Sequence, residues 1–343
     1  MFLQALRGEK TREVPFWFMR QAGRYLPEYR ELRAQKGGFL EMVYDPEAAA
    51  EVTLQPIRRF GMSAAILFSD ILVIPHALGQ HLEFQAGEGP KLEPVRDEKA
   101  LEKLSLENID KTLSPIYQTL RNVRSSLTVE RFHDTAIIGF AGSPWTVACY
   151  MVEGQGSKDY LTVKTLSYQN PEFFTALIDL IVEATAQYLI KQIEAGAEVV
   201  QLFDSWSGAL DAEGFKRWCI EPTAKIVQQI RAVHPEIPVI GFPRGAGINY
   251  ESYAWETGVT AIALDPSINT KWAASHLQTR LPVQGNLEPA ILLAGGAAME
   301  DAARKILTDL SDGPFVFNLG YGIHKDTSID HVERLAAIIR DYK

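Results

Sequence analysis

The stretch PEFFTALIDLIVEATAQYLIKQIEAGAEVVQLF, residues 171–203, contains a helical pattern that passes directly into a strand pattern. Apolar residues recur at helical spacing over 171–196, where Pro171 suits the first turn of a helix and Gly196 suits its end. The following run, EVVQLF (198–203), is short, apolar and rich in valine, as buried strands are. A long helix followed at once by a buried strand predicts a β/α unit with a parallel sheet.

Seven more short β-rich runs lie on either side of this unit: PFWFM (15–19), AAILF (64–68), AIIGF (136–140), PVIGF (238–242), TAIAL (260–264), PVQ (282–284) and FVFNL (315–319). Segments with helical apolar spacing separate them. Eight strands, each followed by a helix, predict a closed (β/α)8 TIM barrel rather than an open doubly wound sheet.

One connection in this predicted barrel is much longer than the others, running from Asp70 to Thr135 after the second strand. It contains turn signals around GEGPKLEPV (87–95) and a helical stretch near 114–128. This pattern predicts an elaborated loop rather than a second domain. No fixed-period repeat and no linker divides the chain, so we expect one domain over residues 1–343.

Composition limits the possible partners and compartments. The 343 residues are 46% hydrophobic and carry a formal net charge of −9, which opposes binding to nucleic acids and anionic membranes. No uninterrupted apolar run reaches the length of about 18 residues that a membrane span needs, so we expect a cytoplasmic protein. The two cysteines, Cys149 and Cys219, are expected to be buried thiols, since they are too few for a disulfide framework or a structural zinc site.

Polar residues follow each predicted strand, which is where barrel enzymes carry their chemistry. Strand ends also contain ordinary turn residues, so this pattern alone is open to both interpretations. The residues at these positions are Arg20, Asp70, Ser143, Asp204 with Ser205, Arg244, Asp265, Asn286 and Tyr321.

The most basic segment of the chain is MRQAGRYLPEYR (19–30), with Arg20 and Arg24 on either side of Ala22 and Gly23. Guanidinium groups match carboxylates in a bidentate way, so several in one loop favour a polycarboxylate ligand despite the negative total charge. A solvated, salt-bridged loop explains the same residues equally well.

Three other positions have a functional and a structural interpretation each. Asp70 is a lone carboxylate in the apolar segment ILFSDILVIP (66–75), where it either caps a turn or stabilises positive charge on a ligand. Tyr150 and Trp145 in GFAGSPWTVACYMVEG (139–154) form either the wall of a pocket or, more commonly for such residues, part of the core. Ser205 in LFDSWSG (202–208) is a turn hydroxyl or a ligand contact.

Motifs for several large enzyme classes are missing from the sequence. It has no Gly-x-x-x-x-Gly-Lys-Ser/Thr, no well-placed Gly-x-Gly-x-x-Gly, no His-Glu-x-x-His and no Gly-x-Ser-x-Gly. Nucleotide hydrolysis, dinucleotide redox chemistry, zinc proteolysis and serine hydrolysis therefore lose support. The residues alone predict a β/α-barrel enzyme for an anionic ligand, with no metal or organic cofactor indicated.

Two long segments resemble the signatures of uroporphyrinogen decarboxylases: PFWFMRQAGRYLPEYRELR (15–33) and GFAGSPWTVACYMVEG (139–154). Shorter matches follow in family order at FSDILVIPHALG (68–79), QLFDSWSG (201–208), GFPRGAG (241–247), QGNLEP (284–289) and FNLGYGI (317–323). The resemblance implies a (β/α)8 homodimer that converts uroporphyrinogen III to coproporphyrinogen III in heme biosynthesis without a metal or organic cofactor.

Residue roles are implied by the same resemblance. Arg20 and Arg24 match carboxylate-binding arginines, with Arg20 also a candidate for handling the reacting carboxylate, and Gln21, Ala22 and Gly23 contribute to the same loop. Asp70 matches the aspartate that meets the pyrrole N–H groups, Tyr150 the active-site tyrosine, and Ser205 a hydroxyl that contacts substrate. The proposed catalytic residues are Asp70, Arg20 and Tyr150.

The last motif departs from the family, which usually has histidine between the two glycines where this chain has Tyr321. A phenol donates a hydrogen bond but offers no imidazolium, so a charge-based role at this position is in question. His324 lies three residues later and is a candidate replacement if the loop coils. Two alternatives stay open: a corrinoid-linked methyltransferase of the same superfamily, although GFPRGAG lacks that class's zinc ligands, and a non-catalytic tetrapyrrole binder.

Overall fold

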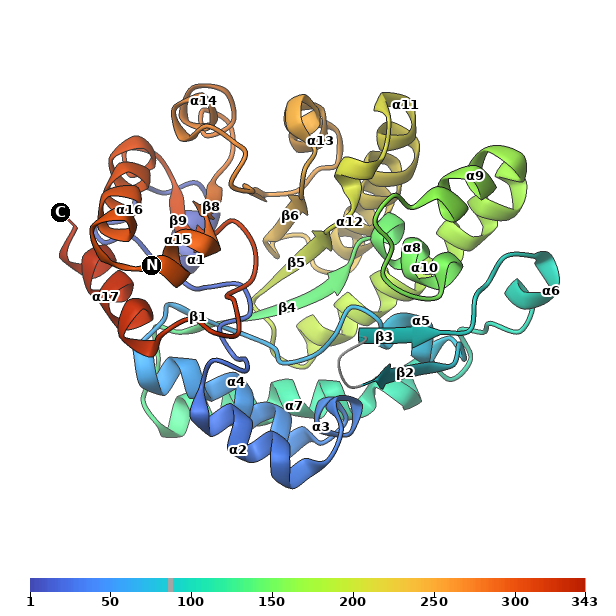
Figure 1. Ribbon diagram of the computed structural model, residues 1–343, viewed down its shortest axis with the longest axis horizontal. Coiled ribbons are helices and arrows are strands. Elements are labelled where there is room, and N and C mark those ends of the chain that lie inside the picture. The colour runs from blue at the N-terminus through green and yellow to red at the C-terminus, as the bar shows by residue number, and fades with distance from the viewer. Residues whose placement is uncertain (86–88, 343) are drawn as a thin grey trace.

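The computed structural model describes residues 1–85 and 89–342 and consists of a curved parallel sheet surrounded by helices (Figure 1). Seven parallel strands lie in the order β1-β4-β5-β6-β7-β8-β9, so neighbours in the sheet follow one another along the chain. Their bounds are β1 (Ala64–Ile66), β4 (Ala136–Gly142), β5 (Val199–Asp204), β6 (Val239–Pro243), β7 (Ala261–Ala263), β8 (Val283–Leu287) and β9 (Phe315–Leu319). Seven of the eight predicted strands are thereby confirmed.

The predicted strand at 15–19 is wrong as a regular strand, because only Phe16 forms a bridge, to Phe317 of β9. The backbone N–H of Trp17 still donates to the Phe317 carbonyl, and the N–H of Ser63 donates to the Phe16 carbonyl. Most other donors of the segment go to side chains: the N–H groups of residues 16, 18 and 19 bond Ser63 Oγ, Gln21 Oε1 and Asn318 Oδ1. The segment thus lies between β9 and the start of β1 without a continuous ladder.

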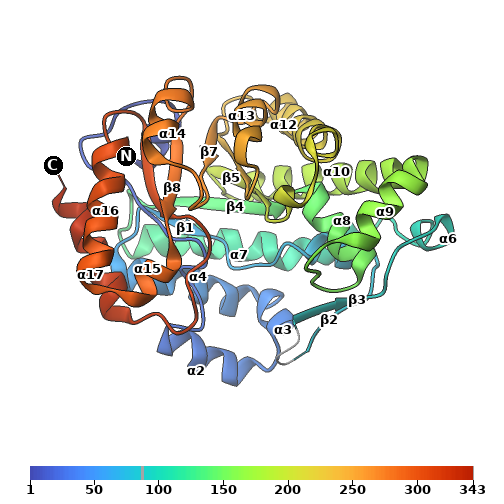
Figure 2. The same ribbon diagram turned by 45° about the horizontal axis from the view of Figure 1, so that its top comes forward.

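Helices cover the outside of the sheet, and α7 and α10 run beside β4 (Figure 2). Their bounds are α1 (Phe2–Leu6), α2 (Pro27–Lys36), α3 (Phe39–Val43), α4 (Pro46–Phe60), α5 (Val73–Ala77), α6 (Glu98–Leu101), α7 (Ile109–Val129), α8 (Pro144–Glu153), α9 (Leu161–Gln169), α10 (Pro171–Glu194), α11 (Ala212–Phe215), α12 (Glu221–Val233), α13 (Tyr250–Glu256), α14 (Thr270–His276), α15 (Pro289–Ala294), α16 (Gly296–Leu310) and α17 (Ile329–Asp341). Three short helical segments complete the set: η1 (Ser207–Ala209), the π-helical η2 (Lys216–Ile220) and η3 (Gly247–Asn249).

Helix α10 confirms the helix predicted over 171–196. It begins at Pro171, and the side chain of Asn170 accepts a hydrogen bond from the N–H of Phe173 at its first turn. Among the described residues it is the one helix long and apolar enough to match a membrane span. Its apolar window is 61% buried against the rest of the protein, which identifies it as a core helix here.

The long connection after Asp70 contains more structure than an elaborated loop. It holds α5, an antiparallel hairpin of β2 (Leu82–Gln85) and β3 (Gly89–Leu92), then α6 and α7. The predicted turn over 87–95 overlaps β3, and its residues 87 and 88 lie outside the described part of the chain. The helix predicted near 114–128 begins earlier, at Ile109.

The hydrophobic core runs from Phe2 to Ile339 and includes both faces of the main sheet. Cys149 and Cys219 are both free and buried, as predicted. Burial of the thiols raises the pKa of each, so neither is a reactive thiolate at neutral pH. Helix α1 lies beside β9, and α17 lies beside α4. Figure 1 shows both termini on the side of the molecule where α16 and α17 lie.

Candidate active site

The carboxyl ends of the seven parallel strands meet at one edge of the sheet, and most of the predicted site residues lie there. Asp204 ends β5, Arg244 follows β6, and Tyr321 follows β9. Asp70 follows β1 by four residues. The strand order therefore gathers side chains that are up to 251 residues apart in the sequence, from Asp70 to Tyr321.

Asp70 is partly exposed, and its Oδ1 accepts a hydrogen bond of 2.8 Å from the N–H of Leu72 at the entry to α5. No other hydrogen bond to its carboxylate occurs among the described residues. Burial raises the pKa of Asp70 to about 6, while the Leu72 N–H and the charge of Arg20 oppose the rise. Above that pH the site presents a poorly solvated carboxylate with a free oxygen.

Arg20 is exposed and has a φ of 59°, in the left-handed region that an L-residue other than glycine rarely adopts. Such a conformation costs about 1 kcal/mol, so the surrounding contacts must fix it. The Arg20 side chain lies against Gly322 so closely that a Cβ there would overlap it. Neither Arg20 nor Arg24 forms an ion pair within residues 1–85 and 89–342, which leaves two guanidinium groups for a ligand.

Between these arginines, Gln21 is fully buried, while Ala22 and Gly23 are partly exposed. The Gln21 amide donates to the Ala64 carbonyl at 3.0 Å and accepts from the N–H of Phe18 at 3.2 Å. Its backbone carbonyl also accepts from the Tyr25 hydroxyl at 2.7 Å. Gln21 therefore holds the arginine loop against β1, and its fully buried side chain is not exposed to a ligand.

Tyr150 extends from α8 and is partly exposed, whereas Trp145 in the first turn of the same helix is completely buried. Burial raises the pKa of Tyr150, the charge of Asp70 adds to the rise, and Arg20 opposes it, so the three groups lie near one another. The Tyr150 ring lies 6.2 Å from that of Trp206, which in turn lies 5.3 Å from the ring of Tyr160. The 139–154 segment thus supplies one core residue and one residue of the site.

Ser205 is partly exposed between β5 and η1, with no side-chain hydrogen bond among the described residues. Its neighbour Asp204 is fully buried and accepts a 2.6 Å hydrogen bond from Thr146 Oγ1 of α8. Burial raises the pKa of Asp204 to about 6, against hydrogen bonds from Thr146 and Cys219. The same Thr146 oxygen accepts from the N–H of Trp206 at 3.1 Å, which joins α8 to the Ser205 loop.

The side chain of Tyr321 faces the loops after β6 and β8. Its hydroxyl donates a short hydrogen bond to Glu288, and the guanidinium of Arg244 lies 4.7 Å from the centre of its ring. The Glu288 bond raises the pKa of Tyr321, so the phenol stays neutral. His324 is exposed, with Nδ1 3.6 Å from Asp326 Oδ2, and the segment between Tyr321 and His324 forms no helical turn.

Side-chain contacts together with charge interactions link these residues around the carboxyl ends of the strands, and we call this set the ring of contacts. Arg20 is coupled to Asp70, Asp70 to Tyr150, and Tyr150 through Trp206 to Tyr160. Burial raises the pKa of Tyr160, and the charge of Arg244 opposes that rise. Arg244 also stacks on Tyr321, beside Gly322 and Arg20. The sequence patterns did not indicate Trp206, Tyr160 or Glu288 individually, since only the fold brings them to this ring.

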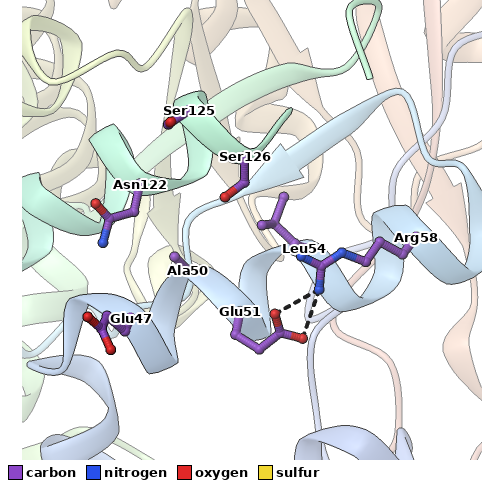
Figure 3. A pocket seen from close by; sticks show the side chains of 8 residues that line it. All are labelled: Glu47, Ala50, Glu51, Leu54, Arg58, Asn122, Ser125 and Ser126. Atoms are coloured by element: carbon purple, nitrogen blue, oxygen red, sulfur yellow. Dashed lines mark hydrogen bonds and ion pairs between the residues drawn. The ribbon is translucent and has the colours of Figure 1, made fainter. Parts of the chain in front are cut away.

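A separate pocket lies on the outer surface between α4 and α7, and none of its eight lining residues belongs to the ring (Figure 3). Arg58 bonds both oxygens of Glu51 there and also pairs with Glu130 at 2.7 Å, so its charge is already neutralised. Within the described residues, no group of three His, Cys, Asp or Glu side chains is arranged to hold a metal ion.

Comparison with solved structures agrees with this architecture. A methyltransferase from Methanosarcina mazei superimposes with a TM-score of 0.81 over 98% of this chain and 96% of its own, at 21% identity. A B12-independent methionine synthase from Shewanella superimposes with a TM-score of 0.55 at 11% identity, covering 97% and 95% of the two chains. At these identities the likeness concerns the fold alone.

Comparison of sequences is more specific. The family model described as "Uroporphyrinogen decarboxylase (URO-D)" matches residues 1–342. The uroporphyrinogen decarboxylase of Erythrobacter litoralis is 54% identical over 343 residues, covering 100% of this chain and 99% of that protein. That of Sphingopyxis alaskensis is 55% identical over 338 residues, covering 98% and 97% of the two chains. With a match along its whole length, the chain belongs to the uroporphyrinogen decarboxylase family.

Proposed function

We propose that this protein removes the carboxyl groups of the four acetate side chains of uroporphyrinogen III, leaving methyl groups and releasing four molecules of carbon dioxide. The product is coproporphyrinogen III, an intermediate of heme biosynthesis. The observation that carries the assignment to this site is Asp70, a partly buried carboxylate with a free oxygen inside the ring of contacts. Arg20 in this ring and Arg24 four residues later form no ion pair among the described residues, and two such guanidinium groups suit a substrate with eight carboxylates.

The chemistry explains why a buried carboxylate is useful. Loss of carbon dioxide leaves an electron pair on the methylene carbon, so the pyrrole must first accept a proton at a ring carbon and become cationic. The bond to the carboxylate then breaks, and its electron pair neutralises the ring. Protonation of the exocyclic methylene and loss of the first proton restore the pyrrole, so each step consumes one proton and releases one carbon dioxide.

Asp70 would act on the charge that develops in this sequence. An ionised carboxylate beside the pyrrole N–H groups accepts their hydrogen bonds and stabilises the cationic ring. Its effect is larger in a poorly solvated site than in water, because the local dielectric constant is lower. The raised pKa of Asp70 is the cost of placing the charge there.

The neighbouring side chains would orient the substrate. Arg20 lies near Asp70 and is placed to hold the reacting acetate, while Arg24 binds a peripheral carboxylate. Arginine retains its proton at neutral pH, so Arg20 serves as an electrostatic partner more readily than as a general acid. Tyr150 and Ser205 supply hydroxyl groups, and Ala22 and Gly23 let the ring of the substrate approach the backbone of the arginine loop.

We further infer that segment 15–19 completes the main sheet as the eighth strand of a (β/α)8 barrel, supported by its bonds to Phe317 on one side and Ser63 on the other. The continuous core supports a single domain over residues 1–343. We also propose a cytoplasmic homodimer that binds neither nucleic acid nor membrane, in keeping with the net charge of −9. Sedimentation of the purified protein would test the dimer.

The test of the function is anaerobic incubation of the chelator-treated protein with uroporphyrinogen III, followed by oxidation and separation of the porphyrins by carboxyl number. Accumulation of the four-carboxyl product supports the decarboxylase. Binding without loss of any carboxyl supports the non-catalytic binder instead. Stoichiometric zinc together with methyl transfer from a corrinoid to a thiol would support the methyltransferase, which the family match does not favour.

A further inference from the structure

Arg244 is a third guanidinium at the ring of contacts, on the loop after β6. It is partly exposed and forms no ion pair within the described residues. Its backbone is fixed from three directions: its N–H donates to the Asp204 carbonyl at 3.1 Å, and its carbonyl accepts from the N–H of Gly208 and from Ser207 Oγ. The next N–H, of Gly245, donates to Asp265 Oδ2 at 2.7 Å. Such an anchored backbone holds the Arg244 side chain at one place on the rim.

The Arg244 side chain is also oriented, because it lies over the ring of Tyr321 at 4.7 Å. Tyr321 cannot turn away easily, since its hydroxyl is bonded to Glu288 Oε1. That oxygen also accepts from the N–H of Ala290 at 3.0 Å, at the start of α15. Glu288 Oε1 thus bonds the phenol and the helix, and Glu288 forms no ion pair with Arg244.

This arrangement bears on which residue takes over the role of the family's usual histidine. Tyr321 contributes its hydroxyl to Glu288 rather than to the site, and His324 is directed to Asp326 at the surface. The unpaired positive charge nearest to Tyr321 in the ring is that of Arg244. On the other side, Gly322 lies against Arg20, so the β9 loop separates two guanidinium groups that form no ion pair among the described residues.

We propose that Arg244 is a substrate-binding residue that holds a propionate carboxylate of the tetrapyrrole, with Tyr321 as its positioning residue and Glu288 as the anchor of Tyr321. The proposal rests on the proposed function. Arg244 follows β6 and Asp70 follows β1, and strands β4 and β5 lie between those two strands in the sheet. We therefore assign Arg244 to a carboxylate other than that of the reacting acetate. The propionates persist through all four decarboxylations, so a guanidinium in a fixed position can bind a propionate at every step.

The first test is the Arg244→Gln variant. We expect KM for uroporphyrinogen III to rise by about 10- to 100-fold, the loss of a charge-assisted hydrogen bond, with kcat within about threefold of wild type. Arg244→Lys keeps the charge but loses the planar fork, so its KM should lie between that of wild type and that of Arg244→Gln. The dissociation constant of coproporphyrinogen III, measured anaerobically through tryptophan fluorescence, should rise in parallel, because that product retains only propionates.

The positioning role of Tyr321 is tested by a double-mutant cycle. Tyr321→Leu should raise KM in the same direction as Arg244→Gln, Tyr321→Phe should raise it less, and the pair Arg244→Gln with Tyr321→Leu should be no worse than Arg244→Gln alone. Arg280→Gln is the matched control: Arg280 stacks on Trp255 at 4.6 Å but precedes β8, at the opposite end of the sheet. Its KM should equal that of wild type.

The proposal is overturned if folded Arg244→Gln binds substrate and product as wild type does, or if only substrate binding is lost, which would assign Arg244 to an acetate. Additive effects of the two substitutions would overturn the role of Tyr321. A wild type that binds but never decarboxylates contradicts the proposed function instead, and the product-binding measurement still tests Arg244 in that case.

Discussion

Asp70 is the residue on which the proposed chemistry depends. The carboxylate is placed where its charge is poorly solvated, and among the described residues the N–H of Leu72 is its one hydrogen-bond donor, with the charge of Arg20 as a second compensation. A structural aspartate is normally surrounded by several donors, as Asp265 is here by Gly245, Tyr250 and Ser267. The contrast between these two aspartates supports an interaction of Asp70 with a ligand.

The activity should have an acidic limb set by Asp70. Its pKa is raised to about 6, so the carboxylate is ionised at pH 7 to 8 and becomes neutral below about pH 6. We expect kcat/KM to fall about tenfold per pH unit below that value. Asp204 also has a pKa of about 6, so the pH profile of Asp204→Asn is the control. An acidic limb that disappears in this variant would assign it to Asp204.

Asp70→Asn should separate function from stability. The pKa is higher in the folded protein than its ordinary value of 3.8, so ionisation of Asp70 destabilises the fold as pH rises from about 4 through about 6. Asparagine removes the charge but keeps the acceptor for Leu72. The variant should therefore gain about 1–3 kcal/mol of unfolding free energy at pH 8, and this gain should disappear near pH 4. A loss of stability at pH 8 would indicate a structural role.

At the scale of elements, the position of Tyr150 depends on how α8 is joined to β5. Thr146 and Asp204 make this connection, with the N–H of Trp206 as the third member.

Helix α10 and strand β5 were predictable because long apolar periodicity determines them locally. The hairpin β2–β3 was not, since its strands LEFQ and GPKL are short and mixed in polarity, and they pack on α3, on Leu72 and on the end of α8 at Gly154.

Thr146→Val should destabilise the protein by about 2–3 kcal/mol, because it removes the hydroxyl that donates to the buried Asp204 and leaves the Trp206 N–H without its acceptor. Thr185→Val on α10 is the matched control. Thr185 is equally buried, but its hydroxyl has no partner among the described residues, so the change should be neutral or slightly stabilising. Urea unfolding midpoints compare the two, and equal losses would contradict the role of Thr146.

At the scale of the whole molecule, the sheet depends on the seam where segment 15–19 meets β9 and β1. The sequence predicted a strand there from its apolar pattern. It could not predict that Ser63, Gln21 and Asn318 would take the backbone donors, because two of these residues are far away in the chain. The ring from Arg20 to Tyr321 had the same limit: individual members were predictable from motifs, but the contact between Arg244, Tyr321 and Glu288 exists only once the sheet has formed.

Asn318→Ala should open this seam locally. It removes the 3.0 Å hydrogen bond that Asn318 Oδ1 accepts from the N–H of Met19, the residue before Arg20. We expect faster amide hydrogen exchange over residues 15–23 and a stability loss of about 1–3 kcal/mol. Amide exchange over β5 and β6 is the internal control, and its rate should change only as far as the global stability of the protein changes. Unchanged exchange over 15–23 would show that the seam does not depend on Asn318.

The most direct test of the decarboxylase through Asp70 is a parallel anaerobic measurement of carboxyl groups lost from uroporphyrinogen III by wild type and Asp70→Asn at pH 7.5. The proposed mechanism predicts the four-carboxyl product from wild type and at least about 100-fold slower loss from the folded variant. Equal rates from the two proteins would contradict the role of Asp70, and no loss from wild type would contradict the function itself.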